Sequence, residues 1–162
     1  MSSSSSSTAP KFVMCGNLSK LAKYLRVLGI DCAYDGGLAL CDAIVIAQVE
    51  GRILIINQPF QTLPGLTSLC LNSDDLGDQI RQVINECGGT SSIEVFSRCL
   101  ICNTTLSIDI PDTAIIPDSV RKRQLQVKHC PACLRNYWQG NHVSRMLMNL
   151  ISLGVNLDRI QS

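Results

Sequence analysis

Two pairs of cysteines carry the most specific chemical pattern in the chain. Cys99 and Cys102 form one Cys-x-x-Cys pair, Cys130 and Cys133 form another, and residues 103–129 lie between them. Each pair can turn two thiolates toward one point, so together they supply four sulfur ligands at the tetrahedral geometry that suits Zn²⁺. Because protein atoms would fill all four positions, no place remains for a bound water. We therefore expect one structural zinc ion with no catalytic part.

Other states of these four cysteines stay open at the level of sequence. They could form two disulfides, remain four unrelated thiols, or hold an iron–sulfur cluster. The chain has nine cysteines, an odd number, and its first ten residues lack the apolar segment of a secretion signal, which disfavours a disulfide framework. The five other cysteines lie in apolar segments, and we expect them to be small buried hydrophobic residues. They are Cys15, Cys32, Cys41, Cys70 and Cys87.

Basic and aromatic side chains form a second pattern, in three places. One is a basic cluster between the cysteine pairs, one follows the second pair, and one is a stripe on an expected helix near the N-terminus. Arg and Lys can contact phosphates and Trp can stack on unpaired bases, so these residues are candidates for binding RNA. The alternatives are a solvated helix face, a solvated loop and core packing of the aromatic side chain. The candidates are Lys20, Lys23, Arg26, Arg121, Lys122, Arg123, Arg135, Trp138 and His142.

Alternating strands and helices must position these residues. Hydrophobic residues make up 46% of the 162-residue chain and charged residues 17%, which is typical of a globular protein. Alternation of β-branched apolar runs with apolar residues at helical spacing predicts a parallel α/β sheet with flanking helices. Asn17, Ser73 or Asp74, and Asn141 are the expected N-caps of helices. The expected strands are 12–14, 31–34, 52–56 and 66–71, and the expected helices are 18–28, 40–51, 74–84 and 141–151.

These patterns divide the chain into three parts. Residues 1–10 are a Ser-rich tail of low complexity, 11–89 form the α/β unit, and 93–154 form a smaller unit with both cysteine pairs and a C-terminal helix. No apolar run approaches the ~20 residues of a membrane span, so we expect no membrane partner. We expect a cytoplasmic protein, although a Ser-rich start is also compatible with an organelle transit peptide.

Three stretches of the chain resemble the Mut7-C family. They are residues 18–31 (LSKLAKYLRVLGID), residues 51–55 (GRILI), and residues 96–102 together with 130–146. The last contains Tyr-Trp-x-Gly-x-His after the second cysteine pair and is the most specific. The resemblance implies a PIN-like ribonuclease domain, with a parallel sheet and flanking helices, followed by a small zinc ribbon and a C-terminal helix.

The sequence departs from this family where carboxylates would hold the catalytic metal ions. The family places an Asp after the first strand, where this chain has Cys15. It places further acids after a Tyr-Asp turn, where this chain has only Asp35 and Asp42, and it has Thr-Arg-Asp where this chain has Asn57 and Gln58. Neutral amides bind Mg²⁺ poorly compared with carboxylates. We therefore expect the nuclease activity to be lost.

Three hypotheses about function follow. The first is a non-catalytic RNA-binding factor, a pseudo-nuclease that docks on a structured ribonucleoprotein such as the ribosome, with ribosomal RNA and ribosomal proteins as partners and no nucleotide cofactor. A net charge of +1 excludes a strong overall basic field and fits docking at one shaped site. The second is a metal-dependent ribonuclease that uses Asp35, Asp42 and Asp74. The third is a protein-interaction module formed by the ribbon and the last helix.

Overall fold

The computed structural model describes residues 8–158, so residues 1–7 of the expected Ser-rich tail lie outside the described part of the chain. Four short strands form one sheet in the order β2-β1-β3-β4, and every neighbouring pair is parallel. This confirms the predicted parallel α/β architecture. The strands are β1 (Phe12–Met14), β2 (Cys32–Ala33), β3 (Ile53–Ile56) and β4 (Ser68–Cys70).

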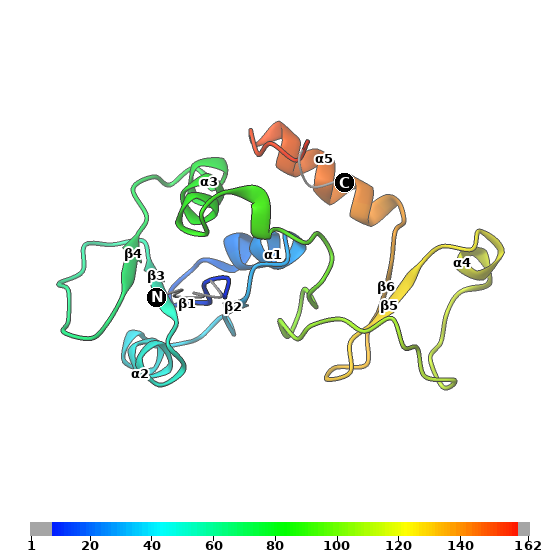
Figure 1. Cartoon of the computed structure of the whole chain (residues 1–162), viewed down its shortest axis with the longest axis horizontal. Helices are drawn as coiled ribbons and strands as arrows, with labels where there is room; N and C mark the ends of the chain where they lie inside the picture. The colour runs from blue at the N-terminus through cyan, green and yellow to red at the C-terminus, as the bar shows by residue number, and fades with distance from the viewer. Residues whose placement is uncertain (1–7, 159–162) are drawn as a thin grey trace, which may run out of the picture.

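Helices cover both faces of the sheet, which is why the central strands are buried (Figure 1). Helices α1 (Ser19–Val27) and α3 (Leu76–Glu86) cover one face, and α2 (Leu40–Glu50) covers the other. Parallel strands that are covered on both faces have continuous apolar sequences, and residues 53–56 (ILII) are an example. Within residues 8–158, no helix combines the length and the apolar character that a membrane crossing requires.

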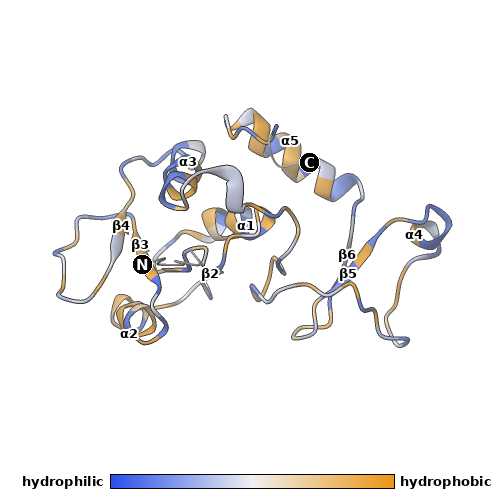
Figure 2. Cartoon of the chain, in the orientation of Figure 1, coloured by the Kyte–Doolittle hydropathy of each residue, from blue (hydrophilic) through white to orange (hydrophobic). Residues whose placement is uncertain are grey.

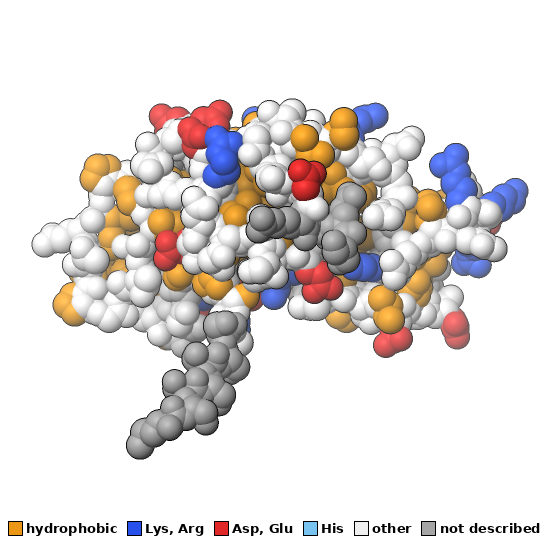
Figure 3. Space-filling model, turned by 45° about the horizontal axis from the view of Figure 1, so that its top comes forward, with side chains coloured by type: hydrophobic (Ala, Val, Ile, Leu, Met, Phe, Trp, Pro, Cys, Tyr) orange, Lys and Arg blue, Asp and Glu red, His pale blue; other side chains and the backbone are white. Residues whose placement is uncertain are grey.

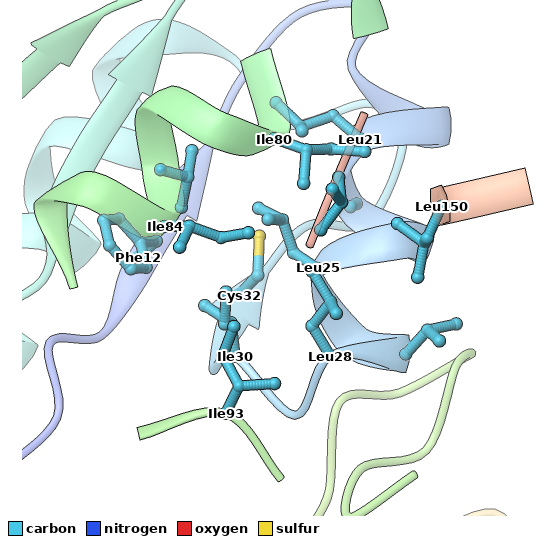
Figure 4. Packing of buried hydrophobic residues seen from close by; sticks show 14 of the residues in the cluster. Phe12, Leu21, Leu25, Leu28, Ile30, Cys32, Ile80, Ile84, Ile93 and Leu150 are labelled. Atoms are coloured by element: carbon cyan, nitrogen blue, oxygen red, sulfur yellow. The ribbon is translucent and has the colours of Figure 1, made fainter. Parts of the chain in front are cut away.

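The largest apolar core lies between the sheet and the helices α1 and α3. Figure 4 shows Leu21 and Leu25 of α1 near Ile80 and Ile84 of α3, with Phe12 of β1 in the same cluster. Helix α5 (Asn141–Ser152) adds Leu150 to this same cluster. These helices carry hydrophobic residues on one side and hydrophilic residues on the other, as Figure 2 shows.

The helix N-termini differ in detail from those expected. Asp75 caps α3, and its side chain accepts a hydrogen bond from the Asp78 amide at 3.0 Å. Helix α1 begins after Leu18 and α5 after Gly140, in both cases without a side-chain cap, so Asn17 and Asn141 do not serve as N-caps. Packing of the apolar faces, more than capping, fixes where these helices begin.

The second unit has little regular structure. A short 3-10 turn, η1 (Thr90–Ser92), leads into it, and strands β5 (Val127–His129) and β6 (Asn136–Trp138) pair antiparallel. The short helix α4 (Asp118–Lys122) lies at the far end of the molecule (Figure 1). The chain then returns as α5, which packs on α1 and shares an apolar core with α1 and α3 of the first unit. The boundary that we predict between the two units, between residues 89 and 93, stays a prediction. Helix α5, which the prediction assigns to the second unit, contributes to the apolar core of the first unit.

The expectation that the five unpaired cysteines are buried is only partly correct. Cys15 and Cys32 are buried and Cys87 is half-buried, whereas Cys41 and Cys70 are exposed. Cys41 lies in the first turn of α2, where the neighbouring buried position Ala43 faces the sheet. Cys70 ends β4, which is an edge strand of the sheet. An apolar segment does not bury every residue, because strands and helices each turn some positions outward.

Candidate functional site

The four paired cysteines converge on one point. Their sulfur atoms all lie within 4.8 Å of one another. Cys99 Sγ is 3.5 Å from Cys133 Sγ, and Cys102 Sγ is 3.4 Å from Cys130 Sγ. Cys99 and Cys130 are buried, while Cys102 is exposed. Four soft donors in a closed arrangement fit Zn²⁺ and leave no open coordination position.

Each cysteine pair uses the same backbone turn to aim its sulfurs. The residue after the second cysteine is left-handed in both turns, Asn103 with φ 66° and Leu134 with φ 62°. Their amides donate to the carbonyls of Cys99 at 3.0 Å and Cys130 at 2.9 Å. The fold therefore supplies two equivalent knuckles, one from each pair, and the four cysteines form a zinc-ribbon-like site that would hold one ion as a structural crosslink.

Polar side chains surround the sulfur cluster. The Tyr137 hydroxyl lies 3.0 Å from Cys99 Sγ, and the Thr104 hydroxyl lies 3.4 Å from Cys102 Sγ. Burial first, and then the contact with Cys99, raise the pKa of Tyr137, so its hydroxyl keeps its proton and can donate to a thiolate. Such contacts orient the ligands of a metal and tune its site.

The first knuckle is fastened to the α/β unit through Asn103 and Asp31. Asn103 Nδ2 donates to Asp31 Oδ1 at 2.8 Å, and Asn103 Oδ1 accepts from the Cys32 amide at 3.0 Å. Arg52 donates to the same Asp31 oxygen at 2.6 Å, and Arg98 lies 3.4 Å from the other oxygen. Burial raises the pKa of Asp31, but the hydrogen bonds from Arg52 and Asn103 outweigh it and hold the pKa below its ordinary value.

Arg26 corrects one of the predicted RNA contacts. Its side chain is only 5% exposed and donates to carbonyls on both units, namely Cys32 at 3.0 Å, Tyr34 at 2.9 Å, Leu100 at 3.1 Å and Ile101 at 2.8 Å. A buried guanidinium with four carbonyl partners is not available to a phosphate. Arg26 therefore binds the first knuckle to α1 and β2, and the prediction of an RNA contact at this position is wrong.

Lys20, Lys23 and His142 come together in the structure, although they belong to separate elements. All three are exposed and line one groove of about 550 Å³ between α1 and α5. Arg145 lines the same groove and is a residue that the sequence reasoning missed. Its position three residues after His142, on the same face of a helix, is the signal that could have found it.

The remaining basic candidates lie on the ribbon. Arg121, Lys122 and Arg123 are exposed at the C-terminal end of α4. Figure 3 shows Lys and Arg side chains gathered at this end of the molecule. Arg135 is exposed after the second knuckle. Trp138 is half-buried and lines a cavity of about 630 Å³ between the ribbon and α5. The structure thus keeps these candidates apart from the groove between α1 and α5.

The strand ends carry polar residues of another kind. Because the four strands are parallel, their carboxyl ends share one edge of the sheet. Cys15 and Gly16 follow β1, and Asn57 and Gln58 follow β3. The Tyr34 hydroxyl, which comes after β2, donates to the Gly16 carbonyl at 2.9 Å. This edge therefore presents the Asn57 and Gln58 amides, the Tyr34 hydroxyl and the exposed carboxylate of Asp35, which follows Tyr34, whereas the Cys15 thiol at the same edge is buried.

The acidic candidates Asp35, Asp42 and Asp74 are not gathered into one ligand set. All three are exposed, and Asp35 accepts a hydrogen bond from the Gly37 amide at 3.1 Å in a local turn. Asp42 lies in the first turn of α2. Among residues 8–158, the four cysteines form the one group of three or more His, Cys, Asp or Glu residues whose ligand atoms lie within 4.8 Å of one another.

The fold and the site together define a class: an α/β domain with a parallel sheet, joined to a four-cysteine zinc-ribbon-like site. Residues 10–150 match the family described as the Mut7-C RNAse domain, and the chain belongs to this family. Comparison with curated proteins and with solved structures found no match.

Proposed function

We propose that this protein is a non-catalytic RNA-binding factor built on a nuclease-like Mut7-C domain. The observation that carries the proposal is the chemistry of the carboxyl edge of the sheet, where Cys15, Asn57 and Gln58 follow the strands. Hydrolysis by hard metal ions needs oxygen ligands, chiefly carboxylates, held at one point. Among residues 8–158, Asp35, Asp42 and Asp74 belong to no group of three or more such ligands whose atoms lie within 4.8 Å of one another.

Basic surfaces support the RNA-binding half of the proposal. The exposed cations of the groove and those of α4 lie on both units, and no acidic residue lines the groove. Lys and Arg on exposed surfaces can neutralise phosphates, and a net charge of +1 limits binding without structural preference. The partner we propose is therefore a structured RNA in a ribonucleoprotein, of which the ribosome is our specific candidate.

One experiment tests binding and cleavage together. Zinc-loaded full-length protein is mixed with a fluorescein-labelled RNA hairpin with a single-stranded 3′ extension, with and without Mn²⁺. Anisotropy reports binding and a denaturing gel reports cleavage. We expect salt-sensitive binding and intact RNA in both conditions. Absence of binding, or cleavage that requires Mn²⁺ and disappears in Asp42→Asn, would overturn the proposal, and the second result would establish the metal-dependent ribonuclease.

The ribosomal partner needs its own measurement. Cell extract is sedimented through a sucrose gradient with and without ribonuclease treatment, and the protein is located by immunoblot. We expect co-migration with ribosomal particles that is lost after RNA digestion or at high salt. Migration as a free species of 17.7 kDa would contradict the ribosomal partner. Co-migration that survives both treatments would favour the protein-interaction module instead.

A further inference from the structure

We propose that the groove between α1 and α5 is the binding site for the phosphate backbone of RNA. This inference rests on the proposed RNA-binding function and assigns a place to it. The groove has a volume of about 550 Å³ and is lined by residues of both helices together with Leu76 at the start of α3. Two helices that are more than 110 residues apart in the chain thus form one concave surface.

Charge is the first feature that favours a phosphate occupant. Lys20 and Lys23 contribute from α1, and His142 and Arg145 contribute from α5, while no Asp or Glu lines the groove. In the described part of the chain, Lys20, Lys23 and Arg145 form no salt bridge. Uncompensated cations at a concave surface raise the local concentration of an anion and favour its binding.

The helices add to the positive potential of the groove. Lys20 lies in the first turn of α1 and His142 in the first turn of α5, so both helices begin beside it. The first turns of both helices contain no acidic residue. The partial positive charge at these two N-termini is therefore not offset by Asp or Glu in either first turn, and it adds to the side-chain charge near Lys20 and near His142. The C-terminal end of α5, at Ser152 and Leu153, also lines the groove and carries the opposite partial charge.

The shape and the polar lining favour a chain of phosphates over a single ion. His142, Arg145, Asn149 and Ser152 recur along one side of α5 and line the groove. A 12-residue helix extends over about 18 Å, which is room for several nucleotides. Asn149 Nδ2 donates to the Tyr24 hydroxyl at 3.3 Å, which places an aromatic ring and a hydroxyl at the wall.

The floor of the groove is apolar and tied to the core. Met146 is buried in the main hydrophobic cluster, and Leu76 and Leu153 pack against that cluster. The cations above this floor are thus held on two helices whose other faces are fixed by packing. Cations that are held in place before binding lose less conformational freedom on binding, which favours this groove as a binding site.

The test compares three variants of the zinc-loaded full-length protein. The groove variant is Lys20→Gln/Lys23→Gln/Arg145→Gln, and a charge-matched variant, Arg121→Gln/Lys122→Gln/Arg123→Gln, removes the same three charges from α4. Lys11→Gln is the control outside both surfaces, since Lys11 is exposed and lines neither cavity. Circular dichroism and zinc content verify the fold of each. The probe is a fluorescein-labelled 16-nucleotide single-stranded RNA of mixed sequence.

The groove variant is expected to bind this RNA at least about 10-fold more weakly than the wild type, because three phosphate contacts are removed. The slope of log affinity against log salt is expected to fall in magnitude by about 2, at roughly 0.7 for each lost contact with a single strand. The α4 variant is expected to lose less affinity, and Lys11→Gln is expected to stay within about 2-fold. Bound RNA is also expected to protect Lys20 and Lys23 from acetylation.

Each contrary result points to a different failure. If the wild type binds no RNA, the proposed function itself fails. If the wild type binds and the two triple variants lose affinity equally, long-range charge alone explains binding and the groove is not the site. If only the α4 variant loses affinity, the proposed function stands and the site lies on the ribbon. If RNA leaves the acetylation of Lys20 and Lys23 unchanged, the proposal that RNA binds in the groove is likewise wrong.

Discussion

At the scale of single residues, Arg26 and Asp31 join parts of the chain that are distant in sequence. Arg26 reaches the carbonyls of Leu100 and Ile101, and Asp31 accepts hydrogen bonds from Arg52 and Asn103. Both side chains are largely withdrawn from solvent. Hydrogen bonds that involve a charged group contribute more than neutral ones, and their loss leaves buried partners unsatisfied.

Replacing Arg26 tests whether it is structural. Arg26→Met keeps the apolar length of the side chain but leaves four carbonyls without their donor. We expect a loss of about 3 kcal/mol in the free energy of unfolding, measured by urea denaturation. Lys23→Met on the same helix is the matched control and should change stability by less than about 0.5 kcal/mol. A stable Arg26→Met variant with weakened RNA binding would restore Arg26 as a contact.

The lowered pKa of Asp31 predicts how the stability of the fold depends on pH. Because its folded pKa lies below its ordinary value of 3.8, the ionised carboxylate stabilises the fold above about pH 4, and this contribution is lost as the pH falls through the folded pKa. Asp31→Asn should therefore cost about 2 kcal/mol at pH 7, and the difference from the wild type should shrink below pH 4. Urea unfolding at several pH values measures this. A difference that stays constant with pH would contradict the assignment.

At the scale of elements, the corner after α1 determines how closely the second unit can approach. Gly29 has φ 78°, and a Cβ on it would collide with the Glu94 carbonyl and lie 2.5 Å from Ser97 Oγ. The Phe96 amide donates to the Val27 carbonyl at 2.9 Å in the same region. A glycine is needed here both for its backbone conformation and for the close contact.

Two glycines with similar backbones separate these effects. Gly36 has φ 86°, and a Cβ on it would meet nothing within 4 Å. Gly36→Ala should therefore cost only the strain of the left-handed conformation, about 1 kcal/mol. Gly29→Ala should cost about 1–3 kcal/mol more, because the backbone of Glu94 must also move. Thermal denaturation of both variants measures the difference, and equal losses would show that the contact with Glu94 is dispensable.

Most of the helices and strands could be predicted from the sequence. Apolar runs and helical periodicity located the four strands and the helices α1, α2, α3 and α5, and the Cys-x-x-Cys spacing identified the zinc ligands. Periodicity shows that a helix has an apolar face but not what covers it, so the packing of α5 on α1 was not predicted. Arg26 was misread because its carbonyl partners lie 74 and 75 residues further along the chain. Local spacing cannot reveal such partners.

At the scale of the whole molecule, hydrogen bonds connect the four-cysteine site directly to the α/β unit. The knuckle that contains Cys99 and Cys102 also supplies Leu100, Ile101 and Asn103 to the contacts with α1 and β2. Metal binding that orders this turn therefore stabilises contacts on the sheet as well.

Removal of zinc should have effects beyond the ribbon. In a chelator, we expect faster hydrogen exchange at the Cys32 amide, which donates to Asn103 Oδ1, and at the Phe96 amide, which donates to Val27. The Ile55 amide, in the centre of the sheet, should stay protected. Cys133→Ser should give the same pattern without chelator. Exchange that rises uniformly would mean global unfolding, and exchange that rises only after residue 99 would contradict the coupling.

The order of the elements along the chain also affects how the protein folds during translation. The core of the first unit includes Leu150, Val155 and Leu157, which are made after both zinc knuckles. During translation, α1 and α3 therefore emerge with part of their apolar surface uncovered, and that surface stays uncovered until residue 157 has left the exit tunnel. Exposed apolar surface of this kind makes nascent chains prone to aggregate and dependent on chaperones. Ordinary domains fold one after another as they appear, but here the core of the first unit is complete only after residues up to 157 have emerged.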